Sequence, residues 1–167
     1  VGNEATFGGG IYMERAGQPH LENLLIVSNK GVGGGLYLNY SAPILTHCTI
    51  ASNQSANSTP GGIFNTNSSA TLQNSILWDN SGSQTTSGIS IRYSIVQGGF
   101  AGTGNMNRDP LFVKATPLGL SPTVNLGDYR LQVCSPAINA GDNAASTLTV
   151  DLDGNVRPFA TGLAIVD

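Results

Sequence analysis

Charged residues and cysteines are both scarce in this chain. Only 10% of the 167 residues are charged, and the seven Lys and Arg side chains are outnumbered by ten Asp and Glu. A net charge of −3 without a basic cluster argues against nucleic acid as a partner, because phosphate backbones require many cationic contacts. The two cysteines, Cys48 and Cys134, are too few for a disulfide framework. We expect two free thiols, with Cys48 a small core residue.

Long apolar runs and recognisable catalytic motifs are also missing. No stretch approaches the roughly 20 apolar residues of a membrane-spanning helix, so we expect no membrane span, and no signal peptide is recognisable. The glycine-rich stretch 98–104 lacks the Lys-Ser/Thr pair of a phosphate-binding loop. His20 and His47 stand alone in the sequence, so no nucleophile–base pair is evident.

Glycine, in contrast, is abundant and recurs in a block that repeats about every 25 residues. Each block has a glycine run followed by Ile or Leu and an aromatic residue. The copies read GGGIY at 8–12, GGGLY at 33–37 and GGIF at 61–64, with a weaker copy at 88–89. Between them lie four segments that align without gaps, at 21–29, 45–53, 72–80 and 91–99. This period predicts stacked units, each of which buries its apolar face on the next.

Within the aligned segments the apolar residues alternate, as in Cys48 and Ile50, which is typical of strands. Parallel strands from successive copies would make each repeat one coil of an all-β solenoid. We expect one domain, 1–167, with regular coils over 1–99 and irregular last coils and a cap over 100–167. Equal offsets predict two inward rows, one of Ile26, Ile50, Leu77 and Val96 and one of Leu21, Leu45, Leu72 and Ile91.

Three asparagines, Asn29, Asn53 and Asn80, occupy the same position in successive repeats. Stacked amides can hydrogen-bond to one another and to turn backbone. We therefore expect them to form a structural ladder at one corner of the coils.

Three aromatic residues, Tyr12, Tyr37 and Phe64, follow the glycine runs next to inward-facing Ile or Leu. Alternation then predicts that they form an outward row on successive coils. Such a row can support itself by ring stacking, and it can also bind the faces of sugar rings. Both interpretations remain open at this stage.

The paired signatures Gly9-Gly10-Ile11 with Ile26–Asn29, and Gly34-Gly35-Leu36 with Ile50–Asn53, resemble the repeats of polymorphic outer-membrane adhesins. Nearly the whole chain resembles the right-handed parallel β-helix of the pectate-lyase-like superfamily, and within it bacterial surface and secreted members. The resemblance implies a parallel β-helix with a C-terminal closing segment, located outside the cell or at its surface. The resemblance to a closing segment rests on four stretches of the tail, at 109–113, 127–131, 135–141 and 151–158.

Polysaccharide lyases with this fold typically carry a Lys or Arg base and acidic residues on the outward positions of one parallel sheet. In this chain the corresponding positions carry no charge. They are Leu25, Val27, Thr49, Ala51, Ile76, Trp78, Ile95 and Gln97. Such a face cannot perform acid–base chemistry, and it requires a cover. We expect that cover to come from 99–128, through Met106, Leu111, Phe112 and Leu118, or from another subunit.

Asp151, Asp153 and Asn155 alternate like the first ligands of a calcium loop, but Gly162 stands where a bidentate Glu is expected. An Asp/Asn turn and a calcium site both remain open. We expect no other cofactor.

These patterns favour a non-catalytic structural or adhesion module that contacts glycans or cell-surface components. One alternative is the C-terminal coils of a carbohydrate-active enzyme whose active site lies upstream. Another is a fibre subunit that self-associates end to end.

Val1-Gly2-Asn3 aligns with 27–29, so we expect the chain to begin inside a repeat and to belong to a longer protein. We also expect Val1–Tyr12 to pair with upstream coils or another copy, and Ser135–Pro158 to close the other end.

Overall fold

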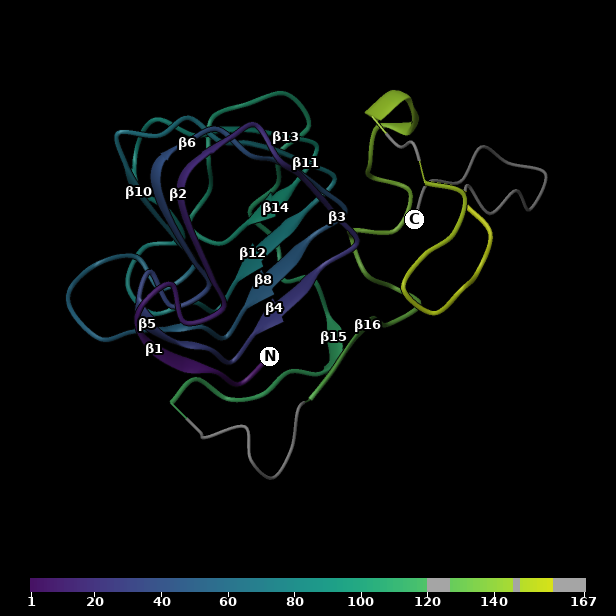
Figure 1. Ribbon diagram of the computed structural model, residues 1–167. Coiled ribbons are helices and arrows are strands. Elements are labelled where there is room, and N and C mark those ends of the chain that lie inside the picture. Colours follow the sequence, from purple (N-terminus) through teal and green to yellow (C-terminus); the bar gives the residue numbers. More distant parts are fainter. Residues whose placement is uncertain (120–126, 146–147, 158–167) are drawn as a thin grey trace.

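The chain forms a parallel β-solenoid of about three turns (Figure 1). The computed structural model describes residues 1–119, 127–145 and 148–157. Each of the first three coils has four short strands. The first coil contains β1 (Glu4–Phe7), β2 (Ile11–Gly17), β3 (His20–Glu22) and β4 (Leu25–Val27). The second contains β5 (Lys30–Val32), β6 (Leu36–Ser41), β7 (Ile44–Thr46) and β8 (Thr49–Ala51). The third contains β9 (Gln54–Ser55), β10 (Ile63–Thr66), β11 (Thr71–Gln73) and β12 (Ile76–Trp78).

Strands at equivalent places in the coils pair in parallel and build four sheets along the solenoid. Their orders are β1-β5-β9, β2-β6-β10, β3-β7-β11-β13 and β4-β8-β12-β14. The last two strands belong to a partial fourth coil and are β13 (Ser90–Arg92) and β14 (Ile95–Val96). Sequence-distant repeats thus meet as neighbours, as the 25-residue period predicts.

Both predicted inward rows are confirmed, and both belong to one hydrophobic core cluster. In the sheet of β4, Ile26 pairs with Ile50, Ile50 with Leu77, and Leu77 with Val96. In the sheet of β3, the row Leu21, Leu45, Leu72 and Ile91 is equally in register. Each coil buries the apolar row of the next, so the core is a continuous column inside the solenoid.

Corners between the short strands contain residues in the left-handed conformation. Between β3 and β4, and at the equivalent place in each later coil, one residue has a φ between 48° and 54°. This corner row is Asn23, His47, Asn74 and Tyr93. The left-handed conformation turns the chain sharply enough for strands of three residues to lie on adjacent sides of one coil, and Asn tolerates it better than most residues.

The glycine repeats are explained at two positions by the close approach of neighbouring coils. A Cβ atom on Gly35 would lie 2.5 Å from the carbonyl oxygen of Gly62, and one on Gly10 would lie 2.6 Å from that of Gly35. Side chains at these positions would push successive coils apart. The repeat of glycine therefore follows from the stacking distance between coils.

The C-terminal end of the coils is closed by residues 100–107. Phe100 packs against the core cluster. The Val96 amide donates to the Met106 carbonyl, and the Met106 amide donates to Ser94. Tyr93 likewise donates to Thr103. Residues 100–107 therefore cover the last coil that the structure describes.

An antiparallel hairpin, β15 (Phe112–Lys114) and β16 (Asp128–Leu131), covers part of the outward face of the β4 sheet. Phe112 confirms the expected cover from 99–128, and the cover continues into Tyr129 and Leu131. Met106 also lies on this side of the coils, because it pairs with Ile95 at the end of the β4 sheet and lines a cavity together with Ile76, Ile95 and Leu131. Leu118, in contrast, is 40% exposed.

Residues 135–145, which contain the 3₁₀ turn η1 (Asn143–Ala145), and residues 148–157 lie along the side of the coils. Figure 1 shows them, in yellow-green, beside β3 and outside the solenoid. Asn74 exchanges two hydrogen bonds with the Asp142 backbone, and Asn23 donates to the Val150 carbonyl. We expected Ser135–Pro158 to close the C-terminal end, and Pro158 itself lies outside the described residues. The segment takes this place because corner amides offer it hydrogen bonds, while the end already pairs with Met106.

Two further expectations can be compared with the described residues. Cys48 is buried, Cys134 is exposed and both are free thiols, which confirms the prediction. No helix in the described ranges is long and apolar enough to cross a membrane.

Candidate functional site

The aromatic residues of the glycine repeats form an outward ladder across β2, β6 and β10. Tyr12 pairs in register with Tyr37, and Tyr37 with Phe64. The ring centroids of Tyr12 and Tyr37 are 5.4 Å apart, and those of Tyr37 and Phe64 are 5.2 Å apart. Phe7 on β1 adds a fourth ring, 5.3 Å from Tyr37. We call these four residues the aromatic ladder.

Phe7 could not be found from the repeat pattern, because it precedes its glycine run while the other three rings follow theirs. It is also one of the more accessible rings. Phe7 is 50% exposed and Tyr12 is 47% exposed, whereas Tyr37 and Phe64 are partly buried between their neighbours. The ladder therefore presents ring surface to solvent at its first-coil end.

Polar groups flank the aromatic ladder on the same strands. The Tyr12 hydroxyl donates to Glu14 Oε2 at 3.0 Å, and this bond raises the pKa of Tyr12 above its ordinary value. Asn39 Nδ2 donates to Glu14 Oε1 at 3.3 Å. Arg15 lies 5.6 Å above the Tyr40 ring, at the end of the same strand pair. Exposed rings beside carboxylate, amide and hydroxyl groups suit a hydroxyl-rich ligand such as a sugar chain.

The predicted asparagine ladder is present at the corner that follows β4, β8 and β12. Asn29 Nδ2 donates to Asn53 Oδ1, and Asn53 Nδ2 donates to Asn80 Oδ1, both at 2.9 Å. Asn3 extends the row, because its Nδ2 donates to Asn29 Oδ1 at 3.3 Å. The three inner asparagines are buried, so the ladder is a structural element of the coils and not an accessible binding surface.

The outward face of the β4 sheet is closed to large ligands where the hairpin covers it. Val27 and Ala51 are fully buried against Phe112 and Tyr129. The Phe112 and Tyr129 rings pack edge to face, with centroids 5.1 Å apart. This face therefore contributes to the hydrophobic packing of the protein.

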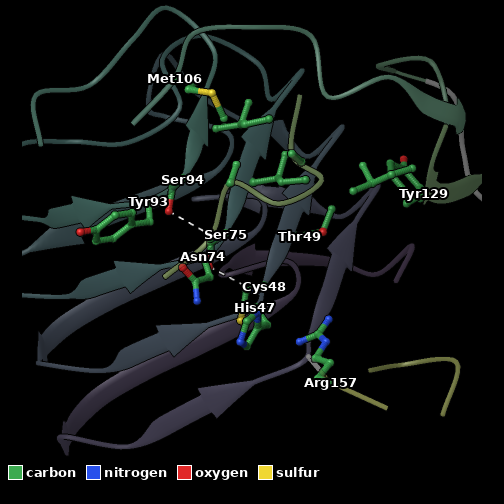
Figure 2. A pocket seen from close by; sticks show the side chains of 16 residues that line it. His47, Cys48, Thr49, Asn74, Ser75, Tyr93, Ser94, Met106, Tyr129 and Arg157 are labelled. Carbon is green, nitrogen blue, oxygen red and sulfur yellow. Dashed lines mark hydrogen bonds between the residues drawn. The ribbon is translucent and has the colours of Figure 1, made fainter. Parts of the chain in front are cut away.

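A lateral cleft of about 130 Å³ lies between the coil corners and the C-terminal segment (Figure 2). Its lining includes the apolar residues Ile76, Ile95 and Leu131 and the basic residues His47 and Arg157. Burial, with a smaller effect of the Arg157 charge, lowers the pKa of His47 to about 4. The Nε2 atom of His47 is buried and has no hydrogen-bond partner. His47 is therefore neutral at pH 7 and is not engaged as a base.

Other nucleophile candidates along this cleft are occupied by structural bonds. Burial raises the pKa of the Cys48 thiol to about 11, so it remains protonated. Ser75 Oγ accepts from the Cys48 amide and donates to the Gln73 carbonyl. Ser94 Oγ makes the equivalent pair of bonds, because it accepts from the Ser75 backbone amide and donates to the Arg92 backbone carbonyl. Figure 2 shows this chain of bonds along the corner. The hydroxyl groups of Ser75 and Ser94 in this cleft therefore join neighbouring coils through hydrogen bonds.

The candidate calcium loop is folded around its first carboxylate. Asp151 Oδ1 accepts from the backbone amides of Asp153 and Asn155 at 2.9 and 2.7 Å, and Asp151 Oδ2 accepts from Asn155 Nδ2 at 2.9 Å. This is the geometry of an Asp/Asn turn. A calcium ion would share the Asp151 carboxylate with these donors, and Gly162 lies outside the described residues. Across the described ranges, no three His, Cys, Asp or Glu side chains are grouped to hold a metal.

Taken together, these features define a parallel β-solenoid with an outward aromatic ladder, an internal asparagine ladder and one covered face. Comparison with known proteins found no matching family model, no matching curated protein and no matching solved structure. The arguments about function below therefore rest on the β-solenoid fold and on the side chains that it arranges.

Proposed function

We propose that this chain is a non-catalytic adhesion module of a secreted or cell-surface protein, and that its aromatic ladder binds a glycan chain. The observation that carries the proposal is the continuous row of four rings, with Phe7 and Tyr12 about half exposed. Parallel coils repeat the rings at roughly 4.8 Å, so a sugar chain lying along the solenoid could contact more than one ring.

Two further features support this proposal. Glu14 and Asn39 stand beside Tyr12, where they can exchange hydrogen bonds with sugar hydroxyls. The resemblance of the glycine repeats to those of surface adhesins points to the same location and role. The covered, uncharged β4 face favours binding over polysaccharide cleavage in this part of the protein.

The proposal is tested by titrating the purified chain with a panel of soluble neutral and acidic polysaccharides. We expect at least one to bind, and Tyr12→Leu to weaken that binding by about fivefold, because one exposed ring contributes about 1 kcal/mol. Tyr93→Ala is the matched control, since it removes an aromatic ring from the corner on another side of the coils. Circular dichroism checks that both variants remain folded.

Absence of binding across the panel, or binding that Tyr12→Leu and Tyr93→Ala weaken equally, would contradict the proposal. Cleavage of a bound polysaccharide, abolished by changing one Lys, Arg or Asp, would instead support the alternative of a carbohydrate-active enzyme.

A further inference from the structure

The first coil ends the solenoid with four edge strands. Within the described residues, β1, β2, β3 and β4 each border only one strand in their sheets. The core is also open at this end: Met13 and Leu21 are partly exposed, while their register partners Leu38 and Leu45 are fully buried. Both backbone and apolar side chains are therefore left incompletely covered.

The asparagine ladder has a direction, and this determines what could bind at the open edge. Each asparagine donates from its backbone N and its Nδ2 to the Oδ1 of the asparagine in the next coil, as in Asn29 to Asn53. Among the described residues, Asn3 Oδ1 accepts no hydrogen bond. The first coil thus presents Asn3 Oδ1 as an acceptor, whereas Oδ1 of Asn29, Asn53 and Asn80 each accepts two hydrogen bonds from the preceding asparagine.

A second hydrogen-bonding position is open at the same corner. The other Nδ2 hydrogen of Asn53 is donated to the Ile26 carbonyl, and that of Asn80 to the Ile50 carbonyl, at the end of the strand in a preceding coil. Asn29 is buried, yet in the described residues its Nδ2 donates only to Asn53. The missing acceptor corresponds to a strand end stacked on β4.

We propose that the first-coil edge is a docking surface for one further parallel β-coil, which brings an asparagine to the same corner. Such a coil would donate to Asn3 Oδ1 and accept from Asn29 Nδ2, in continuity with the interfaces already present between coils. Charge favours it as well: Glu4 pairs with Lys30 of the second coil at 2.7 Å, and a basic residue at the equivalent position could pair with Glu4 from the other side.

A second copy of this chain does not fit the same edge. At its C-terminal end, Asn80 has used both Nδ2 hydrogens on Gln84 and Ile50, so it has none left for Asn3. The edge of β14 there is already bonded to Met106. Two first-coil edges facing each other would place one Asn3 acceptor against another.

The test is to extend the chain by one coil in register. A copy of residues 29–52 replaces Val1-Gly2, so that the copied Ser52 precedes Asn3. In this arrangement the copied Asn29 can donate to Asn3 and the copied Ile50 carbonyl can accept from Asn29. We expect hydrogen exchange of the β1–β4 amides to slow by about tenfold, and the copied strands to become protected.

Two controls separate register from mere added length. Inserting one glycine between the copied Ser52 and Asn3 shifts the pairing by one residue and should abolish the gain. Changing the copied Asn29→Ala should reduce protection at Asn3 while the apolar stacking remains. The proposal is overturned if the in-register extension exchanges like a free peptide or unfolds the original coils. It is also overturned if the natural chain sediments as a dimer with protected β1–β4 amides, because a second copy would then occupy the edge.

Discussion

At the residue scale, Asn53 explains why one asparagine recurs in each coil. It is fully buried, and all four of its side-chain hydrogen-bonding positions are occupied. Its Oδ1 accepts twice from Asn29, while its Nδ2 donates to Asn80 and to Ile26. A buried amide is stable only when its polar groups are satisfied in this way, so the ladder ties three coils together at one point.

We predict that Asn53→Ala destabilises the fold by on the order of 3 kcal/mol, because it leaves the buried amide groups of Asn29 and the Ile26 carbonyl without partners. Asn3→Ala, at the exposed end of the same ladder, should cost about 1 kcal/mol. Urea denaturation of both variants measures the difference. Equal costs at the two positions would show that burial of the ladder contributes little.

His47 makes stability depend on pH. Burial and the Arg157 charge lower its pKa to about 4 in the folded state, compared with 6.5 as the ordinary value. The unfolded chain therefore binds a proton at this residue before the folded chain does. We predict that stability from His47 is fully present above about pH 6.5, declines as the pH falls, and levels off below about pH 4.

The matched variant is His47→Asn, because Asn23 and Asn74 hold the same left-handed conformation at this corner. Urea midpoints of this variant should change less between pH 7 and pH 4.5 than those of the natural chain. A second readout is the NMR titration of His47, whose pKa should rise in Arg157→Gln and stay low in Arg157→Lys. An unchanged slope in His47→Asn would assign the pH dependence to other groups.

At the scale of elements, the strands of the coils and the cover by Phe112 could be predicted, whereas the path of the C-terminal segment could not. Ile26, Ile50 and Leu77 share an offset in aligned repeats, so one choice of face applies to all of them. Asn74 and Asp142, in contrast, lie 68 residues apart in the sequence, and the segment after residue 99 has no repeat to align. Its path along the corner depends on tertiary hydrogen bonds, which no local pattern records.

The candidate site shows the same division. Alternation placed Tyr12, Tyr37 and Phe64 on one outward row, but it gave no signal for Phe7 or for the Glu14–Asn39 contact. The lateral cleft needed the C-terminal segment to bring Arg157 near His47, across more than half of the chain. Local periodicity predicts the strands of a solenoid. A site that also needs residues from the non-repeating C-terminal segment can be recognised only in the three-dimensional structure.

The β15–β16 hairpin is the element that makes the apolar β4 face compatible with water. We predict that Phe112→Ala destabilises the protein by about 3–5 kcal/mol and increases binding of a hydrophobic dye, because it uncovers Val27 and Ala51. Val113→Ala, on the exposed side of the same strand, is the control and should change stability by less than about 0.5 kcal/mol. Urea denaturation gives both values. Similar costs for the two changes would mean that the hairpin is not a stabilising cover.

At the scale of the whole molecule, stability is transmitted from coil to coil. In a solenoid each repeat contacts only its neighbours, so a coil in the middle is held on two sides and the first coil on one. Hydrogen exchange should therefore be slowest in the second and third coils and fastest in β1–β4, whose edge is open among the described residues.

Gly10 and Gly35 allow this coupling to be cut at two places with the same chemical change. A methyl group on Gly10 would meet Gly35 and separate the first coil from the second, whereas one on Gly35 would meet Gly62 and separate the second from the third. We predict that Gly10→Ala accelerates exchange mainly in β1–β4 and leaves the main thermal transition in place. Gly35→Ala should lower that transition and broaden it, because it divides the column of coils near its centre. Mass spectrometry of exchanging peptides and calorimetry measure the two effects. A uniform loss of protection in both variants would show that the coils unfold as one indivisible unit.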